Sequence, residues 1–364
     1  FRMGRFSSLG RPSSPSTFHP SFMPDSRERP DASPIPFAPH PWFRGGHAQT
    51  IVGRYLGPNR DGLPSRAETI DLGDGDRLHV FDSVPDGWRP GAPAALLVHG
   101  LASSAEAPYI LRMARRLNEL GVRVVRMNLR GAGDGFGMAR RIYHAGRTED
   151  LRAVVDWLSA SAEGSPIAVV GFSLGANLAL KLAAEASRAS YPGVPLDCVV
   201  AANPPIDLSA CCRAMLRREN KLYDWSFVRW LRGEVRRLHA RFPDLGPHGI
   251  EAVRSVYEFD DRYTAPRNGF DGAEDYYRKS SAGPLAPEIA IPGLVVHAAD
   301  DPFIPASTFE EVQFPQNVQF ELLPAGGHLG YVARAPWRGD RRWLETRLAD
   351  WLARRWGLET VPPS

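Results

Sequence analysis

The chain has 364 residues, 43% of them hydrophobic and 23% charged, which is the composition of an ordinary globular protein. Lys and Arg number 44 against 41 Asp and Glu, and the resulting net charge of +3 is too even to indicate nucleic acid binding by itself. The three cysteines, Cys198, Cys211 and Cys212, form no C-x-x-C motif. They are therefore expected to be reduced structural thiols rather than a disulfide framework or a zinc site.

No segment has the length of a membrane span. The longest uncharged run, residues 164–180, falls short of the roughly 20 apolar residues that a transmembrane helix needs. Arg2, Arg5 and Arg11 near the start are not followed by the apolar run of a secretory signal. We therefore expect a cytoplasmic protein.

The first 41 residues contain nine prolines and eight serines and almost no hydrophobic periodicity. Such a composition buries too little apolar surface to offset the entropy lost on ordering, so we expect residues 1–40 to be a disordered leader. The folded domain is then expected over residues 41–364. It opens with residues 41–51, PWFRGGHAQTI, whose aromatic, Gly and His residues predict that this segment docks onto the domain.

The pattern of the domain changes from a hairpin to alternating strands and helices. Strands at 68–72 and 77–84 are predicted to be joined by a tight turn at Gly73-Asp74-Gly75. Further strands are predicted within residues 94–100, 122–129, 166–170, 198–204, 293–300 and 318–324, and helices up to Leu120 and over 148–161, 174–181 and 340–355. Strands that are apolar on both faces and separated by crossover helices indicate an α/β fold with a mainly parallel sheet.

The alternation stops between Pro204 and Pro292, a stretch too long for a structureless loop. We interpret residues 205–291 as a mostly helical cap inserted over the carboxyl edge of the sheet. Residues 213–241 carry nine basic and three acidic residues among aromatic and aliphatic ones. They form either an amphipathic surface that contacts anionic lipid or RNA, or an ordinary cap helix with a solvated basic face, which is the interpretation we favour.

The stretch 166–181, PIAVVGFSLGANLALK, has the most specific chemical pattern. It runs from a buried strand through Gly171-Phe-Ser173-Leu-Gly175 into a helix. A G-x-S-x-G pattern in this context is typical of a nucleophile elbow, in which glycines permit a turn that exposes the serine. The alternative is a strand-to-helix turn with Ser173 as a capping residue. We expect Ser173 to be a catalytic nucleophile.

A serine nucleophile needs a base, and the base needs a carboxylate that orients it. One predicted strand runs into Asp300 and Asp301, and the next runs into His328 within a GGHLG string, so the order is Ser, Asp, His. We assign Asp301 as the acid because a proline follows it four residues later, and we leave Asp300 to cap the turn. The alternatives are a capping role for Asp301 and a structural role for His328.

Two backbone amides are expected to stabilise the negative charge that develops on the substrate oxygen. One is the N–H of Leu174, the residue after the nucleophile. The other is the N–H of Leu101, in the loop that follows the strand at 94–100.

No cofactor and no metal are expected. The string GAGDGFG at 131–137 follows a strand but does not match G-x-G-x-x-G, and no helix is predicted directly after it, so a dinucleotide site is not expected. His47, His99 and His144 lack H-E-x-x-H or any other ligand spacing. We interpret them as hydrogen-bonded structural groups.

Several strings are longer and more specific than the elbow alone: WFRGGHAQTI, NLRGAG, YHAGRTEDL, GFSLGANLALK, PPIDL, EFDDRYTAPRNGF, DYYRKSS, ADDPFIP and GGHLGY. With them, the chain from residue 41 onward resembles the YheT-like, or AB hydrolase 4, family of the α/β-hydrolase superfamily. The resemblance implies an α/β-hydrolase fold, hydrolysis of short-chain or lipid carboxylic esters, and a triad of Ser173, Asp301 and His328. The loop after Leu101, ASSAEAPYI, departs from the Gly-rich and Ser-rich turns of relatives.

The resulting hypothesis is a serine esterase that forms an acyl-enzyme intermediate, with a small-molecule or lipid ester as its partner. An acyltransferase that uses the same triad is the first alternative. A non-catalytic protein that binds lipid or RNA is the second. Peripheral membrane contact through the basic cap is compatible with these hypotheses, whereas a nucleic acid partner is not expected.

Overall fold

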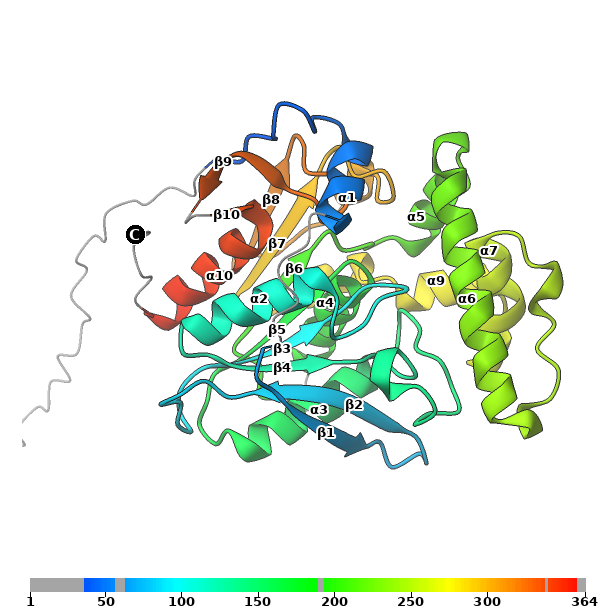
Figure 1. Cartoon of the computed structure of the whole chain (residues 1–364), viewed down its shortest axis with the longest axis horizontal. Helices are drawn as coiled ribbons and strands as arrows, with labels where there is room; N and C mark the ends of the chain where they lie inside the picture. The colour runs from blue at the N-terminus through cyan, green and yellow to red at the C-terminus, as the bar shows by residue number, and fades with distance from the viewer. Residues whose placement is uncertain (1–35, 56–62, 189–192, 338–339, 359–364) are drawn as a thin grey trace, which may run out of the picture. The chain divides into compact units, whose positions relative to one another are not determined.

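A computed structural model describes residues 36–55, 63–188, 193–337 and 340–358. The disordered leader predicted for residues 1–40 lies outside the described residues except for residues 36–40. All structural statements below concern the described residues, and Figure 1 shows the arrangement of their helices and strands.

The central element is an eight-stranded sheet with the order β1-β2-β4-β3-β5-β6-β7-β8. Its first two strands, β1 and β2, form the predicted antiparallel hairpin, β2 pairs antiparallel with β4, and all remaining neighbours are parallel. The strands are β1 Arg66–Asp71, β2 Arg77–Ser83, β3 Ala94–Val98, β4 Arg123–Met127, β5 Ile167–Phe172, β6 Cys198–Ala202, β7 Gly293–Ala298 and β8 Val318–Leu323. The predicted α/β fold with a mainly parallel sheet is therefore confirmed.

Helices cover both faces of this sheet, and this explains why its central strands are uniformly buried and largely apolar. Every residue of β3, β4, β5, β6 and β7 is buried. Alternate residues of β3 enter different cores: Leu96 packs into the cluster that contains α3 and α4, and Leu97 into the cluster that contains α2 and α10. These four helices are α2 Pro108–Glu119, α3 Thr148–Ser161, α4 Leu174–Ala186 and α10 Trp343–Trp356.

Two local differences from the sequence prediction occur near the ends of the domain. The segment expected only to dock forms a helix, α1 Gly46–Tyr55, and it packs near the small sheet of β9 Val332–Trp337 and β10 Asp340–Arg342. The final helix was predicted from Asp340, but residues 340–342 pair with β9 and the helix begins at Trp343. A three-residue strand is too short for its period to be distinguished from the first turn of a helix.

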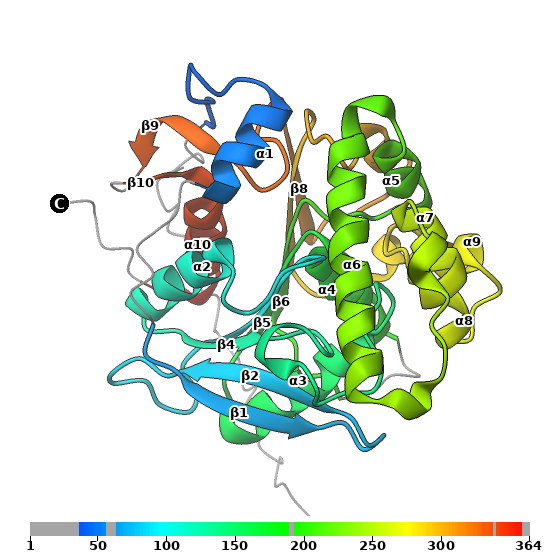
Figure 2. The same ribbon diagram turned by 45° about the vertical axis from the view of Figure 1, so that its right-hand side comes forward.

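The segment between β6 and β7, which contains the predicted cap at 205–291 and is called the cap segment below, is mostly helical. Its helices are α5 Leu208–Met215, α6 Lys221–Arg241, α7 Val256–Phe259, α8 Ala265–Arg267 and α9 Ala273–Ser280, with a π-helical turn at Asp260–Thr264. The buried side of α6, with Val228, Leu231 and Val235, forms a separate core with the chain that follows it. Figures 1 and 2 show α5 to α9 grouped at one side of the sheet, with α6 as the longest element.

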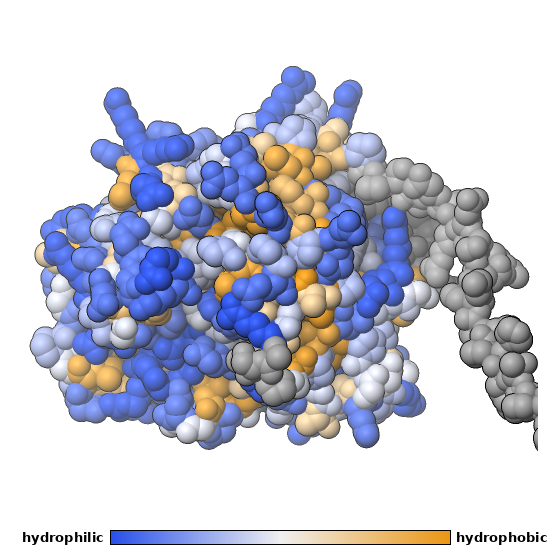
Figure 3. Space-filling view, turned by 180° about the vertical axis from the view of Figure 1, so that it is seen from behind, coloured by the Kyte–Doolittle hydropathy of each residue, from blue (hydrophilic) through white to orange (hydrophobic). Residues whose placement is uncertain are grey.

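The surface is mostly hydrophilic in the view from behind, with smaller hydrophobic areas between the polar ones (Figure 3). Within the described residues, no helix is long and apolar enough to cross a membrane.

Candidate active site

The predicted elbow forms a sharp turn between β5 and α4. Ser173 lies between them with φ 53° and ψ −122°, a backbone conformation that non-glycine residues rarely adopt. A Cβ atom at Gly171 would lie 2.2 Å from the Gly175 oxygen, and one at Gly175 would lie 2.3 Å from the Val98 oxygen. Both glycines are therefore required by backbone contacts.

The Ser173 hydroxyl is directed to a histidine rather than to the backbone of α4. No described N–H of α4 donates a cap hydrogen bond to it, so the alternative of a capping serine does not apply. Instead, Ser173 Oγ lies 2.9 Å from His328 Nε2, and His328 Nδ1 lies 2.8 Å from Asp301 Oδ2. The geometry requires Nδ1–H to donate to the carboxylate, which leaves Nε2 free to accept the serine proton.

The Asp301 carboxylate is buried and accepts four hydrogen bonds. Its Oδ1 accepts from the N–H groups of Phe303 and Ile304 at 2.8 and 3.2 Å, and its Oδ2 accepts from His328 and from Asn203 Nδ2 at 2.7 Å. Burial by itself raises the pKa of Asp301, but the attraction and hydrogen bond of His328, together with the other donors, lower the pKa below its ordinary value. The group is therefore an anion near neutral pH.

Asp300 has a different partner from the one expected. Its Oδ1 accepts a hydrogen bond from Gly327 N at 2.8 Å, so it links two neighbouring loops instead of capping its own turn. Partial burial raises the pKa of Asp300. The structure therefore brings Asp301, and not Asp300, to His328.

The loop after β3 lies against the serine. A Cβ atom at Gly100 would lie 3.0 Å from Ser173 Cβ and 3.4 Å from Ser173 Oγ. The Gly100 N–H donates to the Tyr109 hydroxyl at 3.0 Å, and the Gly100 carbonyl accepts from His99 Nδ1 at 2.7 Å. One residue further on, the Ala102 N–H donates to the Tyr143 hydroxyl at 3.0 Å. Both sides of this loop are therefore held by side chains.

The backbone N–H of Leu101 lies between these anchored groups and remains available as a hydrogen-bond donor. In a trans peptide the N–H of Leu101 points opposite to the Gly100 carbonyl. Because His99 holds that carbonyl, it also fixes the direction of the Leu101 N–H. His99 Nε2 accepts from the Leu129 N–H at 3.1 Å, and burial lowers the pKa of His99 to about 4, so this ring is neutral with its proton on Nδ1. Among the described residues, no group accepts a hydrogen bond from the N–H of Leu101 or Leu174.

Several residues at the site were not found from the sequence. Asn203 follows β6 with φ 47° and bonds to both Asp301 and the Gly327 oxygen. Thr50 accepts from the His328 N–H at 2.8 Å, and Tyr109 holds the Gly100 amide. Only Asn203 had a usable signal, because the carboxyl end of a strand next to the elbow strand is a place where site residues gather.

The three histidines interpreted as structural lie in different places and form no common site. His99 is fully buried and hydrogen-bonded, as predicted. His144 packs against Phe270 and Tyr276, and burial followed by nearby cations lowers its pKa to about 3. His47 is exposed and stacks on Tyr223. No group of three or more His, Cys, Asp or Glu side chains in the described part of the chain is arranged to hold a metal ion.

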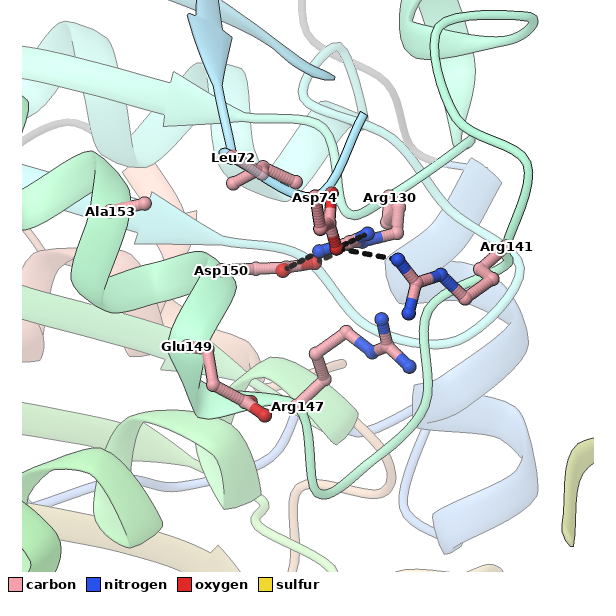
Figure 4. Close-up of a pocket in the computed structure, with 8 residues that line it drawn as sticks. All are labelled: Leu72, Asp74, Arg130, Arg141, Arg147, Glu149, Asp150 and Ala153. Atoms are coloured by element: carbon pink, nitrogen blue, oxygen red, sulfur yellow. Dashed lines mark hydrogen bonds and ion pairs between the residues drawn. The ribbon is translucent and has the colours of Figure 1, made fainter. Parts of the chain in front are cut away.

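A separate polar pocket of about 220 Å³ lies near the β1–β2 turn and the beginning of α3 (Figure 4). Arg130 and Arg141 bridge Asp74, and Arg130 also pairs with Asp150. The complete lining is Leu72, Asp74, Arg130, Arg141, Arg147, Glu149, Asp150 and Ala153. The Arg147 guanidinium donates instead to Asn268 Oδ1. Because the pocket contains none of the residues around Ser173, we interpret Arg130, Arg141 and their carboxylates as a structural ion-pair network.

The comparisons with known proteins agree with this architecture. The profile of the alpha/beta hydrolase fold family matches residues 93–335. The chain is 32% identical over 326 residues to the putative esterase YheT of Escherichia coli, covering 88% of this chain and 94% of that protein. It is 28% identical over 305 residues to phospholipase ABHD3 of Mus musculus, covering 81% and 73%.

Among solved structures, an esterase of Pyrococcus furiosus superposes with a TM-score of 0.51 at 18% identity, covering 80% of this chain and 93% of that one. At this identity the superposition shows a shared fold. The family profile and the similarity to YheT extend over most of the chain. The chain therefore belongs to the alpha/beta hydrolase superfamily and, within it, to the YheT-like family.

Proposed function

We propose that this protein is a serine hydrolase that cleaves carboxylic esters, with Ser173 as nucleophile, His328 as general base and acid, and Asp301 as the group that orients the base. The observation that carries the proposal is the hydrogen-bonded chain from Ser173 Oγ through His328 to the buried Asp301. Relatives named as an esterase and a phospholipase support the same class of reaction.

The first half of the proposed reaction forms the acyl-enzyme. His328 Nε2 takes the proton of Ser173 as Oγ attacks the ester carbonyl, and Asp301 stabilises the imidazolium that results. The N–H groups of Leu101 and Leu174 donate to the oxyanion, and loss of one such donor typically costs about 2.7–4 kcal/mol. His328 then gives its proton to the alcohol that leaves.

The second half releases the acid and regenerates Ser173. A water molecule donates its proton to His328 Nε2 and attacks the acyl carbon, and the same two amides hold the second oxyanion. The intermediate collapses with departure of Ser173 Oγ, which recovers the proton from His328. Each half therefore uses the base and the oxyanion donors in the same positions.

We infer further that the ester carries an apolar chain. The Phe303 ring packs against the His328 ring with centroids 4.8 Å apart, and Tyr223 and Phe227 of α6 make edge contacts with Phe303. These aromatic side chains form an apolar wall beside the base. Turnover of p-nitrophenyl esters from acetyl to palmitoyl tests this inference, and a chain-length optimum at acetyl would contradict it.

The outer side of α6 supports a second proposal, peripheral contact with anionic lipid. Leu222 and Trp225 are 73% and 57% exposed, and residues three apart share one side of a helix. Exposed Lys221 and Arg229 flank this pair, with Arg229 over the Trp225 ring. Cations around exposed apolar side chains fit a lipid surface with negative headgroups.

Cosedimentation with phosphatidylcholine vesicles, with and without phosphatidylglycerol, tests this contact. Binding that requires phosphatidylglycerol and weakens in Trp225→Ser supports it, and absence of binding to either vesicle contradicts it.

Two measurements test the proposed reaction against its alternatives. Ser173→Ala is expected to abolish fluorophosphonate labelling and ester turnover, and undiminished turnover in this variant would contradict the proposal. Product analysis in the presence of a competing alcohol separates hydrolysis from acyl transfer, because a transferase forms a new ester where a hydrolase releases the acid.

A further inference from the structure

We infer that α1 is a positioning element for the catalytic histidine and that Thr50 and Gln49 are its positioning residues. The inference rests on the proposed function, because it concerns the same base. It assigns a role to the string WFRGGHAQTI, whose residues take no direct part in the proposed reaction. Figures 1 and 2 show α1 next to the loops at the ends of β7 and β8.

The segment Gly326–Tyr331, called the His328 loop below, has a strained backbone. Leu329 has φ 60° and Tyr331 has φ 40°, although neither is a glycine. Gly326 and Gly327 also have positive φ angles, 148° and 58°. A conformation of this kind persists only where surrounding contacts determine it, so an external element must hold the loop that carries the base.

Thr50 provides a direct contact to the base residue. Its Oγ1 accepts a hydrogen bond from the His328 N–H at 2.8 Å and donates one to the Gly46 oxygen at 2.7 Å. The threonine hydroxyl is thereby oriented by its own helix. Because the bond is made to the backbone of His328, it fixes the point from which the imidazole reaches Ser173.

Gln49 holds the residue that follows the loop. Its side chain is fully buried, and its Oε1 accepts from the Val332 N–H at 2.7 Å. Its Nε2 donates to the Val332 oxygen at 3.1 Å and also to the Phe43 oxygen. One amide therefore satisfies both backbone groups of Val332, so α1 secures the loop at His328 and at its C-terminal end.

The contact between α1 and the loop is made at backbone distance. A Cβ atom at Gly327 would lie 2.3 Å from the Gly46 oxygen, and one at Gly330 would lie 2.3 Å from the Gln49 oxygen. A Cβ atom at Gly46 would lie 1.8 Å from the Asp300 oxygen, next to the triad acid. The glycines of WFRGGHAQTI and GGHLGY therefore allow α1 to contact both the loop that carries His328 and the loop that carries Asp301.

Thr50→Val tests the inference because it keeps the shape of the side chain and removes its hydrogen bonds. We expect kcat to fall about tenfold with KM within twofold of the wild type, since a small displacement of a catalytic group lowers the rate without changing substrate binding. The rate of fluorophosphonate labelling should fall in parallel. Thr50→Ser retains the hydroxyl and should recover most of both rates.

Ile51→Ala is the matched control on the same helix, because the Ile51 side chain is 47% exposed; its kcat should equal that of the wild type. The inference is overturned if Thr50→Val keeps wild-type kcat, or if its loss of activity is fully explained by unfolding in thermal melts at the assay temperature. Ser173→Ala in the same series separates the two proposals. If it is inactive while Thr50→Val is normal, only the role of α1 fails, and if it remains active the proposed function fails.

Discussion

The anchored loop around Leu101 permits a prediction that distinguishes a loss of kcat from a loss of folding stability. Tyr143→Phe removes the hydroxyl that accepts from the Ala102 N–H at 3.0 Å, and Ala102 has φ 55°, so a strained residue loses its restraint. An unsatisfied buried amide costs about 1–3 kcal/mol of stability, and because the Ala102–Tyr143 hydrogen bond is only partly buried, we expect a loss at the lower end of this range. Complete loss of the Leu101 donor would cost about 2.7–4 kcal/mol in the barrier.

The expected effect is smaller than complete loss, because Tyr109 and His99 still hold Gly100. We expect kcat to fall about tenfold, which corresponds to about 1.4 kcal/mol in the barrier. Removal of both hydroxyls, in Tyr109→Phe combined with Tyr143→Phe, should lower kcat toward the hundredfold range.

The assay compares kcat for a soluble ester with the free energy of unfolding in urea. Tyr276→Phe is the matched control, because the Tyr276 hydroxyl also accepts from a backbone N–H, that of Ala145 at 2.9 Å, but outside this loop. Because its hydrogen bond is fully buried, this variant should lose at least as much stability as Tyr143→Phe, with kcat unchanged. Equal losses of kcat in Tyr143→Phe and Tyr276→Phe, or wild-type kcat in both, would refute the assigned role of the loop.

Three further predictions concern the elbow, the triad acid and the cap segment. Gly175→Ala would place a Cβ atom 2.3 Å from the Val98 oxygen, and we expect a loss of about 3 kcal/mol or more in chemical unfolding; a stable, active variant would be inconsistent with this packing. Asp301→Asn presents an NH₂ group to the donors on His328 and Asn203, so kcat should fall by up to about 10⁴-fold while the fold remains intact, and a loss of less than tenfold would argue against an orienting carboxylate. Burial raises the pKa of Asp260 to about 6, despite hydrogen bonds from Thr264 and Tyr277. The folded state therefore binds this proton more tightly than the unfolded state, and the associated stability is present below about pH 4 and lost as the pH rises through 6. Relative to Asp260→Asn, the wild type should lose up to about 3 kcal/mol between pH 4 and 7 in urea unfolding, and a difference that does not change with pH would contradict the assignment.

The fold was predictable because its signals are local. The buried strands β3, β5 and β6 are continuous apolar runs in the sequence, and the hairpin has an Asp-Gly turn. Gly171 and Gly175 identify the elbow because its strand-turn-helix geometry recurs among proteins and leaves no room for a Cβ atom at these two positions.

The supporting residues of the site could not be predicted, because their partners are distant in sequence. Thr50 and His328 are 278 positions apart, and Asn203 and Asp301 are 98 apart. A hydroxyl or amide side chain gives no periodic pattern that indicates which distant backbone group it bonds. The Asp300 carboxylate illustrates the same limit, since its partner is Gly327 and not a residue of its own turn.

The central claim is that Ser173 becomes acylated and that His328 and Asp301 drive this step. The most direct measurement is intact and peptide mass spectrometry of the protein quenched within the first turnovers of a p-nitrophenyl ester. We predict one acyl group per chain on the peptide that contains Ser173, with a matching burst of p-nitrophenol, and neither in Ser173→Ala. Ester turnover at the wild-type rate without an acyl adduct on Ser173, or with the adduct on another residue, would contradict the account.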